Sequence, residues 1–238
     1  MNAPSRSGRA DRPRVICHMT TSVDGRIVTE GWPQTSDFYR HYEEIHDRFN
    51  AQGWICGRVT MEDFAGGVRD DAEVALEWSG GNAREDFRAT GAFDSFAFAV
   101  DARGKLAWGL NDIDGDHVVA VLSRRVSDEY LAFLRQRGVS YILAGERDVD
   151  LPLALAKIRS LFGVETLMLE GGGRLNGSMM QEGLIDELSV LVAPVCDGRI
   201  GTPALFDIGG EEAHPIGLTL RSVEQLPAGV TWLRFSLT

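Results

Sequence analysis

From Pro13 onwards the chain alternates short apolar runs, typical of buried strands, with stretches whose apolar residues recur every three or four positions, as in helices. The periodic stretches predict helices over Ser36–Gln52, Asp128–Arg137 and Leu151–Phe162, and another helix that starts within Thr60–Phe64. This alternation indicates crossover units and a largely parallel sheet that is covered on both faces. The predicted strands of this part are Arg14–Met19, Trp54–Cys56, Ser95–Val100, His117–Leu122, Val139–Ala144 and Glu165–Leu169.

The C-terminal part of the chain has a different pattern. Strands are predicted over Asp186–Ala193, Leu218–Val223 and Val230–Leu237, with no long helix between them. The last two alternate apolar and polar positions, which favours an antiparallel edge added to the parallel core. We therefore expect one domain over residues 14–238, preceded by a disordered arm over residues 1–13. An acidic, glycine-containing stretch over residues 66–92 is interpreted as an insertion or lid.

Charge and cysteine content limit the possible partners. The 238 residues carry 35 acidic and 24 basic side chains, a formal net charge of −11, which disfavours nucleic-acid binding. No apolar run approaches the roughly 20 residues that a membrane-spanning helix needs, so no membrane association is expected. Cys17, Cys56 and Cys196 are widely separated, which favours free thiols in the cytoplasm. The histidines are isolated and no cysteine pair has metal spacing, so no metal is predicted.

Two glycine-containing turns are the strongest local signals. The strand of Glu165–Leu169 runs into Gly171–Gly173 and then into a helical segment, and Gly57–Thr60 follows the short strand Trp54–Cys56. Glycine lets a ligand approach the backbone closely, and a helix N-terminus presents free N–H groups to an anion. The dinucleotide fingerprint GxGxxG is absent, because residue 176 is Asn. A tight turn packed against the sheet, and helix capping by Thr60, are the structural alternatives.

The order of these pieces resembles a known superfamily. The matching segments are T21-S22-V23-D24-G25, G57-R58-V59-T60, L169-E170-G171-G172-G173, G183-L184-I185-D186-E187-L188 and L191-V192-A193-P194. Over residues 14–207 the chain is similar to the dihydrofolate-reductase-like superfamily, in particular to the riboflavin-pathway pyrimidine reductases that form the C-terminal domain of bifunctional deaminase-reductases. The resemblance implies a three-layer α/β/α fold with a mixed, mainly parallel central sheet and antiparallel C-terminal edge strands.

The resemblance also implies roles for individual residues. In the family the two turns hold the phosphates of NADPH, and the S-x-D-G loop and the Glu before the glycines face the substrate. Ser22, Asp24 and Glu170 become expected substrate contacts, and Asp24 and Glu170 the candidate proton donors. Asp24 is alternatively a turn residue before Gly25. The expected cofactor contacts are Gly57, Arg58, Thr60, Gly171, Gly172, Gly173, Arg174 and Leu175.

Ser123 and Arg124, at the end of the strand HVVAVL, are expected to reach the adenosine 2′-phosphate, which would favour NADPH over NADH. A solvated strand end is the alternative for both residues. The chain departs from the family after the GxxT turn, where Met61–Ala65 lacks the expected proline, and around His46 and Arg48, which are one residue out of step. No deaminase zinc motif precedes this domain in the sequence, so a stand-alone reductase is expected, and the departures leave its substrate open.

The expected function is an NADPH-dependent reductase that transfers a hydride to a C=N or C=O carbon of a small polar heterocycle, such as a riboflavin-pathway ribosylamino-pyrimidine phosphate or a pterin-like molecule. One alternative is a non-catalytic nucleotide-binding protein of the same fold. Another is a dihydrofolate-type reductase, for which Glu43 and Glu44 lie near the place of a pteridine-binding carboxylate. A homodimer is expected from the resemblance and from the apolar edge strands.

Overall fold

The computed structural model describes residues 11–33, 35–69, 84–209 and 214–237. The chain divides into two compact units, of which the first comprises Gln52–Glu165 with the segment before Arg14, and the second comprises Arg14–Ala51 with Thr166–Thr238. Most of the predicted arm and the centre of the predicted lid, residues 1–10 and 70–83, lie outside the described residues.

The first unit is built on parallel strands. Strand β3 pairs in parallel with β2 on one side and with β5 on the other, and β5 also pairs in parallel with β6 and antiparallel with the two-residue β4. Helices α3 and α4 both pack against β6. The bounds are β2 Gly53–Gly57, α2 Arg58–Ala65, β3 Phe96–Val100, β4 Asp112–Ile113, β5 Asp116–Leu122, α3 Asp128–Gln136, β6 Ser140–Leu143 and α4 Leu151–Phe162.

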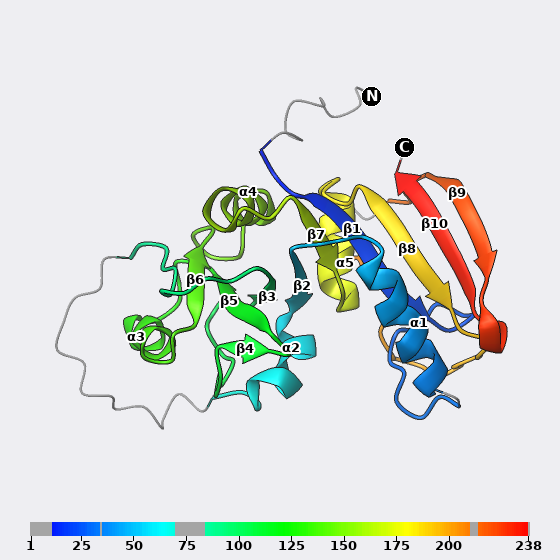
Figure 1. The fold of residues 1–238 in the computed structure, drawn as a ribbon, viewed down its shortest axis with the longest axis horizontal. Helices are drawn as coiled ribbons and strands as arrows, with labels where there is room; N and C mark the ends of the chain where they lie inside the picture. The colour runs from blue at the N-terminus through cyan, green and yellow to red at the C-terminus, as the bar shows by residue number, and fades with distance from the viewer. Residues whose placement is uncertain (1–10, 34, 70–83, 210–213, 238) are drawn as a thin grey trace. The chain divides into compact units, whose positions relative to one another are not determined.

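Strand β1 is the centre of the second unit. It pairs in parallel with both β7 and β8, whereas β10 pairs antiparallel with β8 and with β9. Figure 1 shows α1 lying across β1 and β8, and β9 at the edge beyond β10. The bounds are β1 Arg14–Thr21, α1 Thr35–Asp47, β7 Thr166–Leu169, α5 Gly173–Gln181, β8 Glu187–Val192, β9 Leu218–Gln225 and β10 Thr231–Leu237.

A buried histidine ties α1 to this sheet. The His18 ring, fully buried on β1, contacts the Tyr42 carbonyl oxygen through Nε2 at 3.1 Å and the Ser189 hydroxyl through Nδ1 at 2.9 Å. The Trp232 indole N–H donates to the same hydroxyl at 2.8 Å. Burial lowers the pKa of His18 to about 4, so the imidazole is neutral near pH 7. A neutral ring suits these hydrogen bonds, because its Nε2–H donates to the Tyr42 carbonyl oxygen while its Nδ1 accepts from the Ser189 hydroxyl.

The predicted α/β class, with a mixed and mainly parallel sheet, is confirmed, as are the antiparallel C-terminal strands. Two details of the prediction are wrong. Helix α1 ends at Asp47 instead of Gln52, because its last amides form tighter i→i−3 bonds and Asn50 takes a left-handed backbone with φ of 47°. The short strand β4 is also missing from the prediction, because two residues carry no readable periodicity.

Candidate active site

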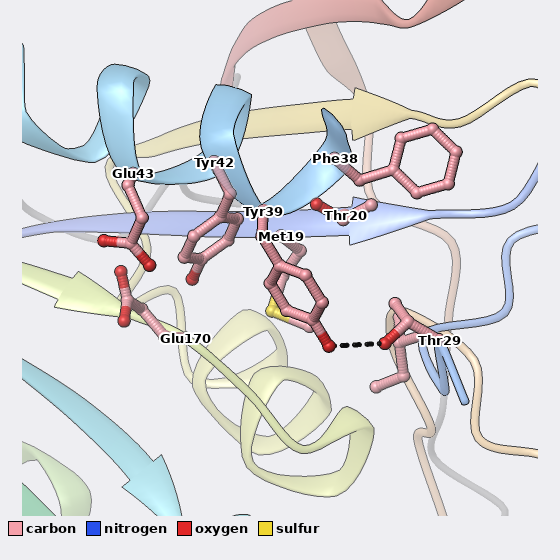
Figure 2. A pocket seen from close by; sticks show the side chains of 9 residues that line it. Met19, Thr20, Thr29, Phe38, Tyr39, Tyr42, Glu43 and Glu170 are labelled. Carbon is pink, nitrogen blue, oxygen red and sulfur yellow. Dashed lines mark hydrogen bonds between the residues drawn. The ribbon is translucent and has the colours of Figure 1, made fainter. Parts of the chain in front are cut away.

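A cavity of about 230 Å³ opens in the second unit where β1 and β7 end. Met19 and Thr20 come from β1, and Glu170 follows β7 directly. Helix α1 supplies three aromatic residues and one carboxylate to the wall, and the loop after β1 supplies two residues. These further lining residues are Phe38, Tyr39, Tyr42 and Glu43 from α1, and Ile27 and Thr29 from the loop (Figure 2).

Two carboxylates from different elements share this cavity. Figure 2 shows the Glu43 and Glu170 side chains pointing toward one another from α1 and from the end of β7. The Glu170 side chain is mostly buried, and its Oε1 lies 3.6 Å from Nε2 of His46, which is one further turn along α1. That distance is an electrostatic contact and not a hydrogen bond. The arrangement offers acceptors to a ligand that is rich in N–H donors.

The thiol of Cys17, whose pKa is affected by the charge of Glu170, has no nucleophilic role. Cys17 is fully buried on β1, and burial, with a smaller contribution from the charge of Glu170, raises the pKa of its thiol well above the ordinary value. The thiol is therefore neutral near pH 7, and the thiolate that nucleophilic chemistry needs is not formed.

A hydrogen bond between two lining residues of the cavity joins α1 to the loop after β1. It forms between the hydroxyls of Tyr39 and Thr29, at 3.1 Å (Figure 2).

The triple-glycine turn connects β7 to α5. Gly171 and Gly172 have φ of 128° and 28°, a region that other residues rarely adopt. Gly173 is needed for packing, since a Cβ there would lie 2.3 Å from the Ala204 carbonyl oxygen. Helix α5 begins without a side-chain hydrogen bond at its N-cap, so its first amides have no capping side chain. Of the two neighbouring candidates in α5, Arg174 is exposed and Leu175 is buried.

The second turn lies in the first unit, between β2 and α2. Gly57 is the N-cap of α2 with an extended backbone and no side-chain cap bond, so helix capping by Thr60 is not how this N-terminus is satisfied. The Arg58 guanidinium forms an ion pair with Glu62 one turn along the helix. Arg58 is partly exposed, and Thr60 is at the third position of α2.

Ser22 and Asp24 do not line the cavity, because they hold two loops of the second unit together. The Ser22 hydroxyl donates to Asp24 at 2.7 Å, and the Asp24 carboxylate accepts the Asp197 and Gly198 amides at 2.9 and 3.0 Å. These bonds, first the one from Ser22, lower the pKa of Asp24 to about 2. An ionised Asp24 near pH 7 is a poor proton donor, so the geometry favours Glu170 for that role.

Ser123 and Arg124 are engaged within the first unit. The buried Ser123 hydroxyl donates to the Ala102 carbonyl oxygen at 2.7 Å and accepts the Arg125 amide at 3.3 Å. The Arg124 side chain pairs with Glu146 at 3.5 Å. Both residues sit at the end of β5 as expected, and the contacts described here are with protein groups of neighbouring loops.

The comparisons with known proteins agree with this architecture. The model of the RibD C-terminal domain matches residues 13–232. This chain belongs to the RibD C-terminal domain family. The predicted family is confirmed, and so is the class, a reductase of the riboflavin-pathway type.

This RibD C-terminal domain is 41% identical over 214 residues to the 2,5-diamino-6-ribosylamino-4(3H)-pyrimidinone 5′-phosphate reductase of Methanothermobacter thermautotrophicus, covering 88% of this chain and 92% of that one. It is 28% identical over 209 residues to the reductase of the same name from Aquifex aeolicus, with 84% of each chain covered.

Solved structures share the fold. A pyrimidine reductase-like protein from Corynebacterium diphtheriae superposes with a TM-score of 0.67 at 15% identity, over 99% of this chain and 96% of that one. RibD of Acinetobacter baumannii superposes with a TM-score of 0.63 at 21% identity, over 96% of this chain and 59% of that one.

Within the described ranges no group of three or more His, Cys, Asp or Glu side chains is arranged to hold a metal, and no helix is long and apolar enough to cross a membrane.

Sequence analysis selects few of the residues around the cavity, and it names Glu43 only for the dihydrofolate-type alternative; the residues on α1 show why. Tyr39, Glu43 and His46 are spaced four and three positions apart, so they form one stripe on the helix beside the buried stripe that contains Phe38 and Ile45. The periodicity that predicts α1 contains this second stripe. The periodicity alone does not show which side of the buried stripe faces the strand ends. Only the tertiary structure shows which residues of α1 face the cavity.

The hydrogen bonds by which Asp24 joins two loops predict how the stability of the protein depends on pH. Because the pKa of Asp24 is lowered from 3.8 to about 2 on folding, the stabilisation from its bonds is present above about pH 4 and is lost as the pH falls toward 2. We expect Asp24→Ala to lower the thermal unfolding midpoint at pH 7, and the difference from wild type to shrink between pH 4 and pH 2. Asp94→Ala, which removes an exposed carboxylate of the first unit, is the control. Equal midpoints of Asp24→Ala and wild type at pH 7 would contradict the role.

Proposed function

We propose that the chain is an NADPH-dependent reductase of a ribosylamino-pyrimidinone 5′-phosphate, the substrate class in the names of its curated relatives. The observation that carries the proposal is the cavity in which Glu43 and Glu170 face one another. An aminopyrimidinone presents several N–H donors around a flat ring, and two carboxylates with a set of aromatic side chains suit such a ring.

The charge of the cavity indicates which part of the substrate it takes. Its described lining residues include two carboxylates and no Lys, Arg or His. A phosphate among these residues would find no cation and would be repelled by the Glu43 carboxylate, whereas a donor-rich ring gains a charge-assisted hydrogen bond to Glu43. We therefore place the ring against these residues and the 5′-phosphate beyond them.

The two glycine turns fit the phosphates of a nicotinamide cofactor. Both α2 and α5 begin at a glycine N-cap without a side-chain hydrogen bond, which leaves N–H groups available to an anion. We propose Gly57, Arg58 and Thr60 in the first unit, and Gly171–Leu175 in the second, as cofactor contacts. When bound, the reduced cofactor supplies the hydride that adds to the C=N or C=O carbon.

Glu170 is the proposed proton donor to the nitrogen or oxygen of the reduced bond. It lines the cavity, its side chain is mostly buried, and its Oε1 lies 3.6 Å from Nε2 of His46. Hydride addition to carbon leaves a pair of electrons on the neighbouring atom, and a carboxylic acid held against that atom supplies the proton that completes the reduction. His46 is placed to restore the proton to Glu170 from solvent, because its own side chain is partly exposed.

The test of the function is turnover with a defined substrate. We expect oxidation of NADPH, followed by the loss of reduced-nicotinamide absorbance, with 2,5-diamino-6-ribosylamino-4(3H)-pyrimidinone 5′-phosphate, and none with dihydrofolate. Turnover of dihydrofolate instead would select the dihydrofolate-type alternative. Cofactor binding without turnover of either compound would select the non-catalytic alternative and end the proposal.

The proton-donor role is tested by Glu170→Gln, which keeps the size of the side chain and removes the acid. We expect kcat to fall about a hundredfold or more, which is the rate enhancement that a general acid usually contributes, and the affinity for NADPH to stay unchanged. Glu44→Gln is the matched control, because Glu44 is a neighbour of Glu43 on α1 that does not line the cavity. A Glu170→Gln enzyme with wild-type kcat would exclude Glu170 as the donor.

We also propose a cytoplasmic homodimer. The three cysteines are free, which suits a reducing compartment. Strand β9 is exposed at every residue and pairs with β10, and it presents Leu218, Leu220 and Val223 to solvent. Exposed apolar side chains on an edge strand favour a partner of the same kind.

The dimer proposal predicts a sedimentation coefficient of a 52 kDa particle, twice the 26.1 kDa of the chain, at micromolar concentration. Val223→Lys places a charge on the exposed face of β9, and we expect it to shift the distribution toward the monomer. Lys substitution at Leu110, an exposed apolar residue of the first unit, is the control. A wild-type monomer across this range would refute the dimer.

A further inference from the structure

A buried carboxylate of the second unit, Asp197 in the loop after β8, is not among the residues that line the cavity. Its side chain is fully buried, and each of its oxygens accepts two hydrogen bonds. Oδ1 accepts the Arg199 amide at 3.0 Å and the Arg199 Nε–H at 2.8 Å. Oδ2 accepts from Arg199 Nη2 at 2.6 Å and from the Trp32 indole N–H at 2.8 Å. The carboxylate therefore joins its own loop to the loop between β1 and α1.

Arg199 connects this carboxylate to one wall of the cavity. Besides pairing with Asp197, its Nη2 donates to the Val28 carbonyl oxygen at 2.9 Å. Val28 lies between Ile27 and Thr29, the two residues by which the loop after β1 lines the cavity. The guanidinium is a rigid planar fork, so a carboxylate that holds it on one side fixes where it meets the Val28 carbonyl. The ion pair thus sets the backbone that carries Ile27 and Thr29.

Trp32 gives a second connection from Asp197 to the cavity. Its buried ring packs edge-on against Phe38, with the ring centroids 6.5 Å apart. Phe38 lines the cavity from α1. Because the indole N–H is the group that Asp197 accepts, the direction of the ring depends on the carboxylate. One carboxylate therefore supports lining residues on two different elements.

Asp197 is itself held in place and charged. The Asp24 carboxylate accepts the Asp197 and Gly198 amides, and the Val23 amide donates to the Val195 carbonyl oxygen at 2.8 Å. The side-chain bonds of Asp197, first those from Arg199, hold the pKa of its carboxyl below the ordinary value, so the group is ionised near pH 7. Bonds to an ionised acceptor are shorter and stronger than bonds to a neutral one, which suits a fixed support.

We propose that Asp197 is a positioning residue of the active site, which fixes through Arg199 and Trp32 the wall against which the substrate ring lies. It acts from behind the wall and does not touch the ring, because it is not a lining residue. The identity of the ring rests on the function proposed above, whereas the support of the wall does not. A displacement of about 1 Å can cost about a hundredfold in rate, so the support affects catalysis as well as binding.

The experiment compares Asp197→Asn and Arg199→Gln with Glu187→Gln in the full chain. Asn keeps the size of the side chain but turns an N–H group toward donors, so one side of the connection is lost. Arg199→Gln removes the contact with Val28 at a side chain that is 45% exposed, and we expect the fold to tolerate it. Glu187 is the matched control, because it is also a mostly buried carboxylate held by arginine, at the start of β8 and outside the cavity lining.

Four quantities are measured well below the unfolding midpoint of every variant. Calorimetry gives the affinity for NADPH and for 2,5,6-triamino-4(3H)-pyrimidinone, the substrate ring without its ribose phosphate. Turnover gives KM and kcat for the complete substrate. Hydrogen exchange in the protein without ligand reports the opening of residues 26–33, the loop that Asp197 supports.

We expect Asp197→Asn and Arg199→Gln to weaken ring binding and to raise KM about tenfold or more, because the wall moves, with a smaller change in NADPH affinity. Exchange over residues 26–33 rises about tenfold or more in both variants. Glu187→Gln lowers the unfolding midpoint but changes neither KM nor this exchange. A support of stability alone would leave ring affinity and KM at wild-type values in both variants, and this result would overturn the proposal. An equal loss of NADPH affinity, or a raised KM in Glu187→Gln, would overturn it too.

The proposed function and this inference fail separately. If wild type neither binds the ring nor oxidises NADPH with the substrate, the proposed function ends and hydrogen exchange decides the role of Asp197. Faster exchange over residues 26–33 in both variants then keeps the role, and unchanged exchange ends it. If wild type turns the substrate over and both variants keep its KM, the proposed function stands and the role of Asp197 ends.

Discussion

Parallel pairing on both edges of β1 is the constraint on which the second unit depends. With β7 on one side and β8 on the other, the backbone of β1 is hydrogen-bonded without water, and Val15–Met19 are buried. Leu169 is in register with Cys17, so β7 ends beside the middle of β1 and the chain turns there into Glu170. Strand β1 continues past this point, so Met19 and Thr20 meet Glu170 in one cavity although they are far apart in the sequence. The neutral His18 then fixes the position of α1, whose side chains complete the wall.

The lining residues of two cavities, one in each unit, differ in charge, although both belong to one chain with a net charge of −11. In the second unit Glu43 and Glu170 make an acceptor-lined cavity that suits the donors of an aminopyrimidinone ring. In the first unit a second cavity is lined by four cationic side chains and one carboxylate, namely Arg69, Arg103, Lys105, Arg125 and Glu129. Coulomb interactions within a few ångströms are strong where water is partly excluded, whereas the surplus of acidic residues elsewhere is screened by salt.

Glycine in this chain serves two purposes that look alike in sequence. Gly173 and Gly104 are required because a carbonyl oxygen and an aromatic ring lie where a Cβ would be. Gly57 and Gly172 are the N-caps of helices that have no side-chain cap hydrogen bond. The triple-glycine turn combines both purposes, so its packing role and a cofactor role do not exclude one another.

The sequence by itself determined the class of the fold and nearly every element, because buried strands and amphipathic helices carry periods of their own. The bounds of α4, the parallel order and the antiparallel C-terminal strands were all readable from it. The position of Glu170, directly after β7 and before the glycine turn, was also readable from the sequence, since strand, turn and helix are contiguous in the chain. Only the tertiary structure decided that Asp24 joins two loops, that Ser123 supports the backbone at Arg125, and that Glu43 enters the cavity. These facts depend on which segments lie against each other, and a one-dimensional pattern records the face of an element but not the neighbour that this face meets.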